Sequence, residues 1–579
     1  MTTILRDDSN ATATLLEDAG YPLGDIGGVV SLDEGGAPYG VAELTIPLPV
    51  DADLLALLDP RAHRRVQIDL TRERVDGFGS TATRSFNLGL RSADITEGGA
   101  TMQLRLESDE ALLMDDVLLA DAPLSLHSYS SSLRAVVSAV LARIGATLEA
   151  GTADADVTTY ADSMNLIPDP SVEFGASGFA PTNCSLDATD TSWAADGARS
   201  INLWNPTSSD SYVAIGGGPG GVRLGLQAGK SYVLSATGNV KVALAGAAAR
   251  TRCLTVIYRV GQSGYVFVDS PPIPAAVNTP GRVSVAFTLP PGTTEAFVRA
   301  YLGASTGQVR WDAFRLSEAT PNPLDTVFFS GDTPDTAAYD YFWTAASHPT
   351  TSSRRALVDR PAASLSWEPG VSAWEFLQPL VQAAGMRLLC DEDRKWWLLD
   401  GAGYLAPGVT QLSFGAHMLE AASGVSRDGD WYDAALVRYR WTDAAGISQE
   451  RIDWYAEPGY TKARLFDIDA PYPGPGRAEY KVKRAEGLGR TATVRAPLDV
   501  AVTPSQALRL NLPNLPELFG VTRSVDFNLD DFTMTLESRG LTDVPPGAWV
   551  LVNPALVWAS VDPALVWADA TPDDSTIFD

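Results

Sequence analysis

The feature that most constrains this fold is a central stretch, residues 165–317, whose pattern predicts a complete small β-sandwich placed inside another domain. It begins with Asn165-Leu-Ile-Pro-Asp-Pro-Ser-Val-Glu-Phe174 and ends with Gln308-Val-Arg-Trp-Asp-Ala-Phe-Arg-Leu316. The segments on its two sides have the character of halves of one different domain. We therefore expect a discontinuous body that carries a separate module.

Length and composition indicate a multidomain protein that is mainly β. A chain of 579 residues predicts about three to five domains, because single cores rarely grow beyond roughly 200 residues. Apolar residues make up 45% and charged residues 20%, which argues against wholesale disorder. The 50 glycines and 38 prolines, with short alternating apolar runs between them, favour strands joined by turns. The expected fold is mainly β with a small α/β portion.

The charge is strongly acidic, with 71 Asp and Glu against 43 Lys and Arg and a net charge of -28. Such a surface repels phosphate backbones, so we do not expect the protein to bind nucleic acid by electrostatic attraction. The same sign suits a wall past which DNA slides without adhering. The simpler interpretation is that the acidity keeps a large β protein soluble.

No segment has the pattern of an export signal or a membrane span. The first twenty residues lack the apolar core of a signal peptide, and no apolar run approaches spanning length. We expect a protein made in a cytoplasm and not inserted in a membrane. The cysteines are Cys184, Cys253 and Cys390, an odd number that argues against a disulfide framework. Cys184 and Cys253 could pair, but we expect two reduced, buried thiols.

The first segment predicts an antiparallel β-barrel or half-barrel. Apolar and polar residues alternate over 42–48, 66–70 and 102–106, which gives each run one buried and one wet face. Glu97-Gly-Gly99 is a turn signal between two of these strands.

Two amphipathic helices flank the central stretch. In the first, apolar residues from Leu133 to Ile144 follow helical spacing, with Ser131 or Ser132 as N-cap and Gly145 at the end. In the second, Ser372 and Glu375 form a capping box, while Pro379 predicts a kink or a later start. Each helix leads through Gly-x-x-Leu into an extended segment. This predicts one α/β layer interrupted by the insertion.

The remaining sequence predicts a second barrel followed by an extended arm. Its expected strands are residues 436–441, 451–455, 478–483, 491–495, 507–512, 525–529 and 532–537. Near the C-terminus, Asn553-Pro-Ala-Leu-Val-Trp-Ala559 returns as Asp562-Pro-Ala-Leu-Val-Trp-Ala568. Two Leu-Val-Trp clusters separated by proline suit an arm that docks into pockets of a neighbour through Leu556, Trp558, Leu565 and Trp567. Alternatively, they are edge strands that pack on the chain's own barrel.

Catalytic motifs are missing from the sequence, and we expect no enzyme. The four histidines, His63, His127, His348 and His417, have no metal-binding spacing. No Gly-x-Ser-x-Gly occurs, and the glycine-rich run 216–221 lacks the Lys-Ser/Thr of a phosphate loop. Carboxylate pairs such as Asp391 and Asp393 are expected in solvated loops rather than in a glycosidase site.

The ends of the central stretch resemble those of carbohydrate-binding modules of the jelly-roll type. The resemblance lies in Asn-x-x-x-x-Pro-Ser-x-Glu-Phe at residues 165–174, Val-x-Trp-Asp-x-Phe-x-Leu at 309–316 and Asp-Gly-Ala-Arg-Ser-Ile-Asn-Leu at 196–203. It implies a possible structural Ca²⁺ held by Glu173 and Asp312, although both could simply cap strand ends. No other cofactor is expected.

Sugar recognition on such a module needs exposed aromatic rings beside polar groups. The candidate glycan-binding residues are Trp193, Trp204, Tyr212, Tyr258 and Tyr265, whereas Trp311 on the closing strand is expected to pack in the core.

The flanks resemble the minor tail proteins of siphophages that infect actinobacteria. The residues that carry this likeness are Phe329-Ser-Gly-Asp-Thr-Pro-Asp335, Tyr339-Asp-Tyr-Phe-Trp343, residues 348–354, residues 426–433 and Pro471-Tyr-Pro-Gly-Pro-Gly476. The resemblance implies a baseplate hub, in which two related β-barrels per subunit form a trimeric ring below the tail tube. Some hubs of this family carry a peptidase or lysozyme domain, and this sequence lacks one.

The resulting hypothesis is a structural virion protein, a homotrimeric tail-tip hub whose inserted module contacts host-surface glycan. Implied partners are the distal tail protein, the tape measure and other tail-tip proteins, with DNA passing the lumen. Two alternatives stay open: a secreted or virion-borne glycan-active enzyme with an accessory binding module, and an insert that contacts only other virion proteins. The predicted boundaries are 1–125 for the N-terminal hub barrel, 126–164 and 345–425 for the interrupted layer, 165–320 for the inserted module, 321–344 for a return linker, 426–545 for the second barrel and 546–579 for the arm.

Overall fold

The protein forms two compact units in a computed structural model. The model describes residues 6–16, 20–49, 52–75, 80–95, 98–319, 326–401, 403–443, 446–513, 515 and 517–543. One unit, here called the split unit, comprises Met1–Leu124, Ser131–Val157 and Trp367–Asp579. The other, here called the middle unit, comprises Ser125–Ser130 and Thr158–Ser366. With 47% strand and 11% helix, the fold is mainly β, as predicted from the sequence.

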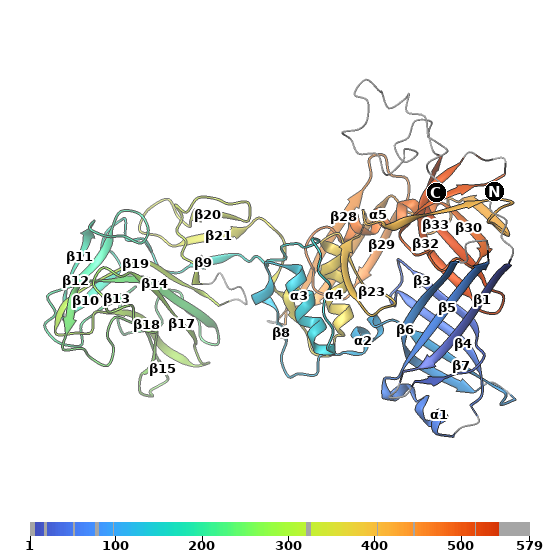
Figure 1. The fold of residues 1–579 in the computed structure, drawn as a ribbon. Helices are drawn as coiled ribbons and strands as arrows, with labels where there is room; N and C mark the ends of the chain where they lie inside the picture. The colour runs from blue at the N-terminus through green and yellow to red at the C-terminus, as the bar shows by residue number, and fades with distance from the viewer. Residues whose placement is uncertain are drawn as a thin grey trace. The chain divides into compact units, whose positions relative to one another are not determined.

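A thirteen-stranded sheet dominates the split unit (Figure 1). Its main path runs from the N-terminal strands through β3 to the C-terminal strands, and all neighbours along this path are antiparallel. In spatial order the strands are β2 (Tyr21–Pro22), β1 (Arg6–Leu15), β5 (Arg65–Val75), β6 (Ser80–Ile95), β7 (Thr101–Glu107), β4 (Gly40–Pro47), β3 (Gly27–Asp33), β32 (Leu518–Asn528), β33 (Thr533–Asp543), β30 (Arg490–Pro497) and β26 (Glu420–Val425). Off this path, β31 (Gln506–Asn511) pairs with β32, and β25 (Ala406–Ser413) runs parallel to β31.

The sequence predicted two separate, closed β-barrels, and this prediction was wrong. Strand β3 pairs with β4 on one side and with β32 on the other, so the N-terminal and C-terminal strands share one sheet. None of the sheets formed by the described residues closes into a barrel. The predicted alternation itself is confirmed, since Ala42, Leu44 and Ile46 of β4 are buried while Glu43 and Thr45 are exposed. Alternation shows which face of a strand is buried, but it does not reveal the neighbouring strand.

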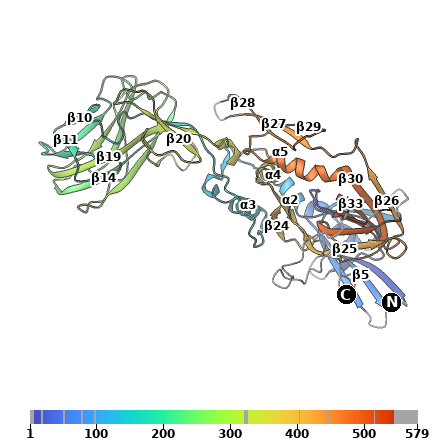
Figure 2. The same ribbon diagram turned by 90° about the horizontal axis from the view of Figure 1, so that it is seen from above.

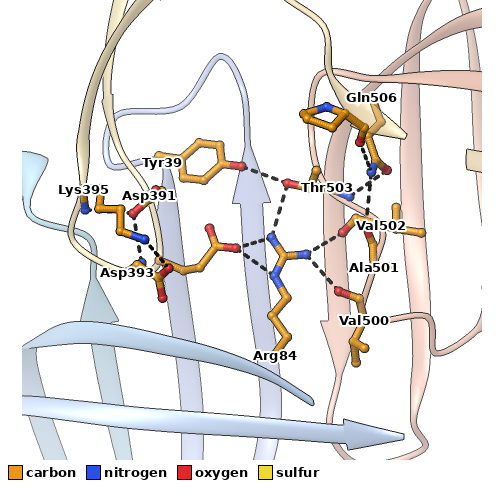
Figure 3. Close-up of polar contacts among 12 residues, drawn as sticks. Tyr39, Arg84, Asp391, Asp393, Lys395, Val500, Ala501, Val502, Thr503 and Gln506 are labelled. Atoms are coloured by element: carbon orange, nitrogen blue, oxygen red, sulfur yellow. Dashed lines mark hydrogen bonds and ion pairs between the residues drawn. The ribbon is translucent and has the colours of Figure 1, made fainter. Parts of the chain in front are cut away.

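A polar network joins the first and last parts of the split unit at Arg84 of β6 (Figure 3). Its guanidinium donates to Glu392 Oε1 over 2.9 Å and 2.5 Å, and to the carbonyl oxygens of Val502 over 2.7 Å and Val500 over 3.2 Å. Thr503 Oγ1 accepts from the same guanidinium over 3.3 Å and lies 3.4 Å from the hydroxyl of Tyr39. One arginine thus connects three stretches that are distant in sequence.

A second network surrounds Glu34, which follows β3 and is fully buried. Its carboxylate contacts Arg484 at 3.1 Å, Arg387 at 3.7 Å and Arg539. The hydroxyl of Ser505 donates to Glu34 Oε2 over 2.7 Å. Burial raises the pKa of Glu34, but the three guanidinium groups outweigh burial and hold this pKa below its usual value. The acid is therefore charged and ties β3 to the C-terminal part of the sheet.

The helices on the two sides of the insertion lie where the sequence predicts them. In α3 (Leu133–Leu141), Ser132 Oγ accepts from Ala135 N over 3.1 Å at the N-cap, and the five buried residues form the predicted stripe. In α4 (Ala373–Ala383), the capping box of Ser372 and Glu375 is present. The helix starts at Ala373 and is continuous through Pro379, so the later start predicted from that proline was wrong, while the alternative, a kink, stays a prediction. After α4 comes the hairpin of β23 (Met386–Cys390) and β24 (Trp396–Asp400).

Residues 478–483, predicted as a strand, form part of helix α5 (Arg477–Ala485). This helix packs against a sheet of β28 (Ser448–Ala456), β27 (Ala434–Thr442) and β29 (Ala463–Ile468), as Figure 2 shows. Ala478, Val482 and Ala485 are buried at helical spacing. The strand prediction failed because Ala478, Tyr480 and Val482 also alternate with Glu479, Lys481 and Lys483, so a short window matched both periods. Two further short helices are α1 (Ala52–Leu57) and α2 (Glu110–Asp115).

The middle unit contains two five-stranded antiparallel sheets with an apolar core between them. The first sheet, here called sheet F, has the order β10 (Phe179–Thr182), β13 (Tyr212–Ile215), β18 (Thr293–Tyr301), β15 (Leu254–Val260) and β16 (Val266–Asp269). The second, here called sheet G, has the order β11 (Ser185–Asp190), β12 (Ser200–Trp204), β19 (Thr306–Glu318), β14 (Ser231–Ala245) and β17 (Gly281–Thr288). Trp311 is fully buried in the core, as predicted. The unit also contains a small sheet of β20 (Tyr339–Trp343), β21 (Ser352–Ala356) and β9 (Ser163–Asn165).

Three expectations concern single features. The cysteines are unpaired, with Cys253 and Cys390 buried and Cys184 partly buried. Gly98 and Gly99 have φ values of 101° and 69°, as the predicted turn requires, while Glu97 lies outside the described residues. In the part of the chain that the structure describes, no helix is long and apolar enough to cross a membrane. The finer domain boundaries stay predictions.

Candidate functional site

The outer face of sheet G places two candidate tryptophans beside polar side chains. Ile201 and Leu203 of β12 are buried in the core, so the intervening Asn202 and the following Trp204 point to the outer face by strand alternation. Trp204 is 42% exposed. Trp193, in the segment between β11 and β12, is partly exposed. We call the set Trp193, Asn202, Trp204, Gln308 and Arg310 the tryptophan face.

Arg310 organises this face through three contacts. Its guanidinium lies 5.6 Å from the centroid of the Trp193 ring and donates to Ser192 Oγ over 2.9 Å and to Asn278 Oδ1 over 2.7 Å. On the neighbouring strand, the Asn202 amide donates to Gln308 Oε1 over 3.4 Å. Arg310 is only 3% exposed and Asn202 only 5%, so these two groups hold the face in place. The exposed Trp204 and the partly exposed Trp193 and Gln308 are the members suited to stacking a sugar ring and binding its hydroxyls.

The other three candidate aromatics belong to sheet F and divide between its two faces. Tyr212 stacks under Arg299, whose Cζ lies 3.9 Å from its ring centroid, and Tyr265 donates its hydroxyl to Glu295 Oε2 over 2.6 Å. Arg299 also lies over Phe297, which contacts Tyr265 at 5.9 Å, so Tyr212 and Tyr265 belong to one outer cluster. Tyr258 packs against the core instead. The structure therefore groups Tyr212 with Tyr265 through Arg299 and Phe297, while Trp193 contacts Arg310 and Trp204 lies on the same sheet as Arg310.

The two carboxylates predicted for calcium meet at one loop, residues 195–199. Glu173 Oε1 accepts from the main-chain N–H groups of Ala198 over 2.7 Å and Arg199 over 2.8 Å. Asp312 Oδ2 accepts from Ala195 N over 2.6 Å and Asp196 N over 2.9 Å. The loop needs Gly197, which has φ of 68° and whose missing Cβ would lie 2.4 Å from Glu173 Oε1.

Burial raises the pKa of two carboxyl groups at this loop. Burial, together with the neighbouring Asp196, raises the pKa of Asp312 to about 7. Burial also raises the pKa of Asp196, with Glu173 and Asp332 acting in the same direction. The N–H groups already occupy carboxylate lone pairs, and among the described residues no group of three His, Cys, Asp or Glu is placed to hold a metal. The geometry as it stands fits loop fixation better than a preformed metal site, and calcium stays a prediction.

The carboxylate pair Asp391 and Asp393 holds a tight turn between β23 and β24. Asp391 accepts from the main-chain N–H groups of Asp393 over 3.0 Å and Lys395 over 2.8 Å, and from Trp397 Nε1 over 2.7 Å. Asp393 pairs with Lys395 at 3.0 Å. These bonds stabilise the turn.

Sequence reasoning identified the tryptophans of the tryptophan face but missed its polar members Asn202, Gln308 and Arg310. The signal available for Asn202 and Arg310 was their position between apolar residues on a strand, whereas Gln308 had no such signal. The docking residues predicted in the C-terminal arm, Leu556, Trp558, Leu565 and Trp567, lie outside the described residues.

Comparisons with known proteins give structural likenesses only. No protein-family model and no curated protein matches the sequence. The chain is similar to the 43 kDa tail protein of prophage MuSo2 from Shewanella oneidensis, with 9% identity, a TM-score of 0.38, and coverage of 91% of this chain and 98% of that one. It is similar to a tail protein from Neisseria meningitidis MC58, with 8% identity, a TM-score of 0.35, and coverage of 92% and 96%. Over 28% of this chain it is similar to 94% of the C-terminal family 22 carbohydrate-binding module of Clostridium thermocellum Xyn10B, with 12% identity and a TM-score of 0.21.

Proposed function

We propose that this chain is a structural protein of a phage tail, in which the split unit builds part of the tail tip and the middle unit presents a glycan-binding face. The observation that carries the proposal is the pairing of β3 with β32. It makes one body of the first and last parts of the chain, while the middle unit has a core of its own. A body of this kind can assemble with other tail proteins and carry the module as a passenger. The sequence resemblance to siphophage minor tail proteins supports the same assignment.

The split unit is proposed to form a homotrimeric hub below the tail tube. In support of this, β26 pairs only with β30 among the strands that the structure describes, and it is exposed along its whole length. Large apolar side chains gather in sequence on and near β25 and β26: Leu405, Val409, Phe414, Leu419 and Val425 are 52–79% exposed. Apolar surface beside an open strand edge is suited to burial between subunits. The distal tail protein and the tape measure are the proposed further partners, and the acidic net charge suits a lumen that DNA passes without adhering.

Assembly is tested by the solution mass of the purified chain with and without residues 165–317. We expect a trimer in both cases, because the proposed contacts belong to the split unit. Light scattering coupled to size exclusion measures the mass. A monomeric full-length chain would contradict the hub, and a trimer lost only on deletion would move assembly to the middle unit.

Glycan binding is tested on the tryptophan face with Trp204→Ala. Loss of one stacking ring is expected to weaken binding of an array-identified glycan on the order of tenfold, about 1.4 kcal/mol. The matched control is Tyr265→Ala on sheet F, which should bind as the natural chain does. If only the control loses binding, the site lies on sheet F. An array without hits would favour a middle unit that contacts only virion proteins.

A further inference from the structure

The split unit contains a cavity whose charge is opposite to that of the chain as a whole. It has a volume of about 240 Å³ and is lined by five cationic side chains and two acidic ones. The cations are Arg464, Lys481, Arg484, Arg523 and Arg539, and the acids are Glu34 and Asp430. In a protein with a net charge of -28, this concentration of positive charge is a local exception. We call it the cationic cavity.

The two acids leave much of that positive charge uncompensated. Glu34 is the buried one, and it is shared by Arg484, Arg539 and the adjoining Arg387. Asp430 lies 3.7 Å from Arg464, but its side chain is 89% exposed, so solvent weakens this pair. Outside the lining, Glu537 approaches Arg523 only to 3.5 Å on the surface. Positive side chains held together without matching acids repel one another and favour a bound anion.

Lys481 of α5 has the least compensated charge among the cations of the lining. Its Nζ lies 4.2 Å from the centroid of the Phe466 ring, and among the described residues it forms no ion pair with a carboxylate. Four of the other five lysines of the chain, Lys230, Lys241, Lys395 and Lys483, each form one. Burial, followed by the neighbouring Arg477 and Arg464, lowers the pKa of Lys481 to about 8. An anion in the cavity would reverse that effect.

We propose that the cationic cavity binds a phosphate group through Arg464, Lys481, Arg484, Arg523 and Arg539. A guanidinium presents a planar fork of donors that matches phosphate oxygens, and an ammonium adds a point charge. The formal excess of three positive charges among the lining residues suits a dianion better than a single carboxylate. The cavity is as large as roughly eight water molecules at about 30 Å³ each, so it has room for a phosphate and part of an attached organic group.

The proposal is independent of the assembly and glycan proposals, because neither the tryptophan face nor β26 contributes to the cavity. Its test also uses a different readout. The chain contains six lysines, so NMR of ¹³C-methylated lysines on the full-length protein can resolve Lys481 from the others. In chloride buffer the Lys481 signal should titrate at about pH 8. Inorganic phosphate is expected to raise that midpoint by about one pH unit or more, equivalent to at least tenfold tighter binding to the protonated form.

Two variants locate the effect. Lys481→Met should weaken phosphate binding measured by calorimetry at least tenfold, whereas Lys395→Met, which removes the same charge in the turn after β23, should leave it unchanged. Glycerol phosphate serves as the second probe: binding tighter than that of inorganic phosphate identifies a phosphate carried by a larger molecule, and equal binding identifies a site for the free ion. Both results support a phosphate site. A Lys481 midpoint that phosphate does not move, or that acetate moves equally, would overturn the proposal.

Discussion

Replacing Glu34 with glutamine is expected to destabilise the split unit on the order of 3–5 kcal/mol. The change removes the buried negative charge and leaves the guanidinium groups of Arg387, Arg484 and Arg539 facing one another with side-chain exposures of only 10–15%. Removing one partner of a buried ion pair costs more than the pair itself contributes, because the remaining charge stays desolvated. The effect should fall on the union of β3 with the C-terminal strands.

Because two units do not unfold in one step, the measurement must report on the split unit alone. Amide exchange at β3 and β32 in a urea series serves this purpose. The matched control is Glu43→Gln on the exposed side of β4, which should change stability by less than about 0.5 kcal/mol. Equal protection of β3 in the two variants would show that the arginines around Glu34 do not depend on its charge.

The second large effect concerns the pH dependence of the middle unit through Asp312. Burial raises the pKa of Asp312 to about 7 from an ordinary value of 3.8, so the folded state favours the protonated acid. Its contribution to stability is therefore fully present below about pH 4 and is lost as pH rises through about 7. At about 1.4 kcal/mol per pKa unit, this amounts to on the order of 4 kcal/mol.

The expected result is a melting temperature of the middle unit that falls between pH 4 and pH 7. Asp312→Asn should flatten the pH dependence, whereas Asp210→Asn, at an exposed position, should preserve it. Scanning calorimetry of the full chain resolves the two units. A pH dependence that survives unchanged in Asp312→Asn would show that another group causes it.

Helix caps and the buried faces of single strands could be predicted from the sequence, whereas the pairing of strands distant in sequence could not. The cap of α3 and the capping box of α4 follow from side chains that bond to nearby main-chain N–H groups, so a few residues determine them. The alternation in β4 likewise depends on one strand alone. Closure of a barrel depends on which edges meet, and the pairing of β3 with β32 joins residues for which no local pattern exists. At α5 the surrounding sheet decided between two periods that the sequence satisfied equally.

The candidate site was predictable to the same extent. Aromatic residues of a sandwich can be named from the sequence, but the sheet to which each belongs follows from strand order. That order separates Trp204 from Tyr265 and turns Tyr258 inward. The sequence did not point to Arg310, because its place in the site depends on contacts with three residues that are distant in sequence.

The joint between β3 and β32 has a consequence for synthesis on the ribosome. Gly28 N and Asp530 Oδ1, which are 502 positions apart, bond at 3.2 Å beside that joint. The main-chain groups at the edge of β3 therefore have no β32 to pair with until nearly the whole polypeptide has emerged. The middle unit, in contrast, can fold as soon as its own residues have left the ribosome. At roughly 5–20 residues per second, this nascent edge is open for tens of seconds, the interval in which a chaperone would have most to protect.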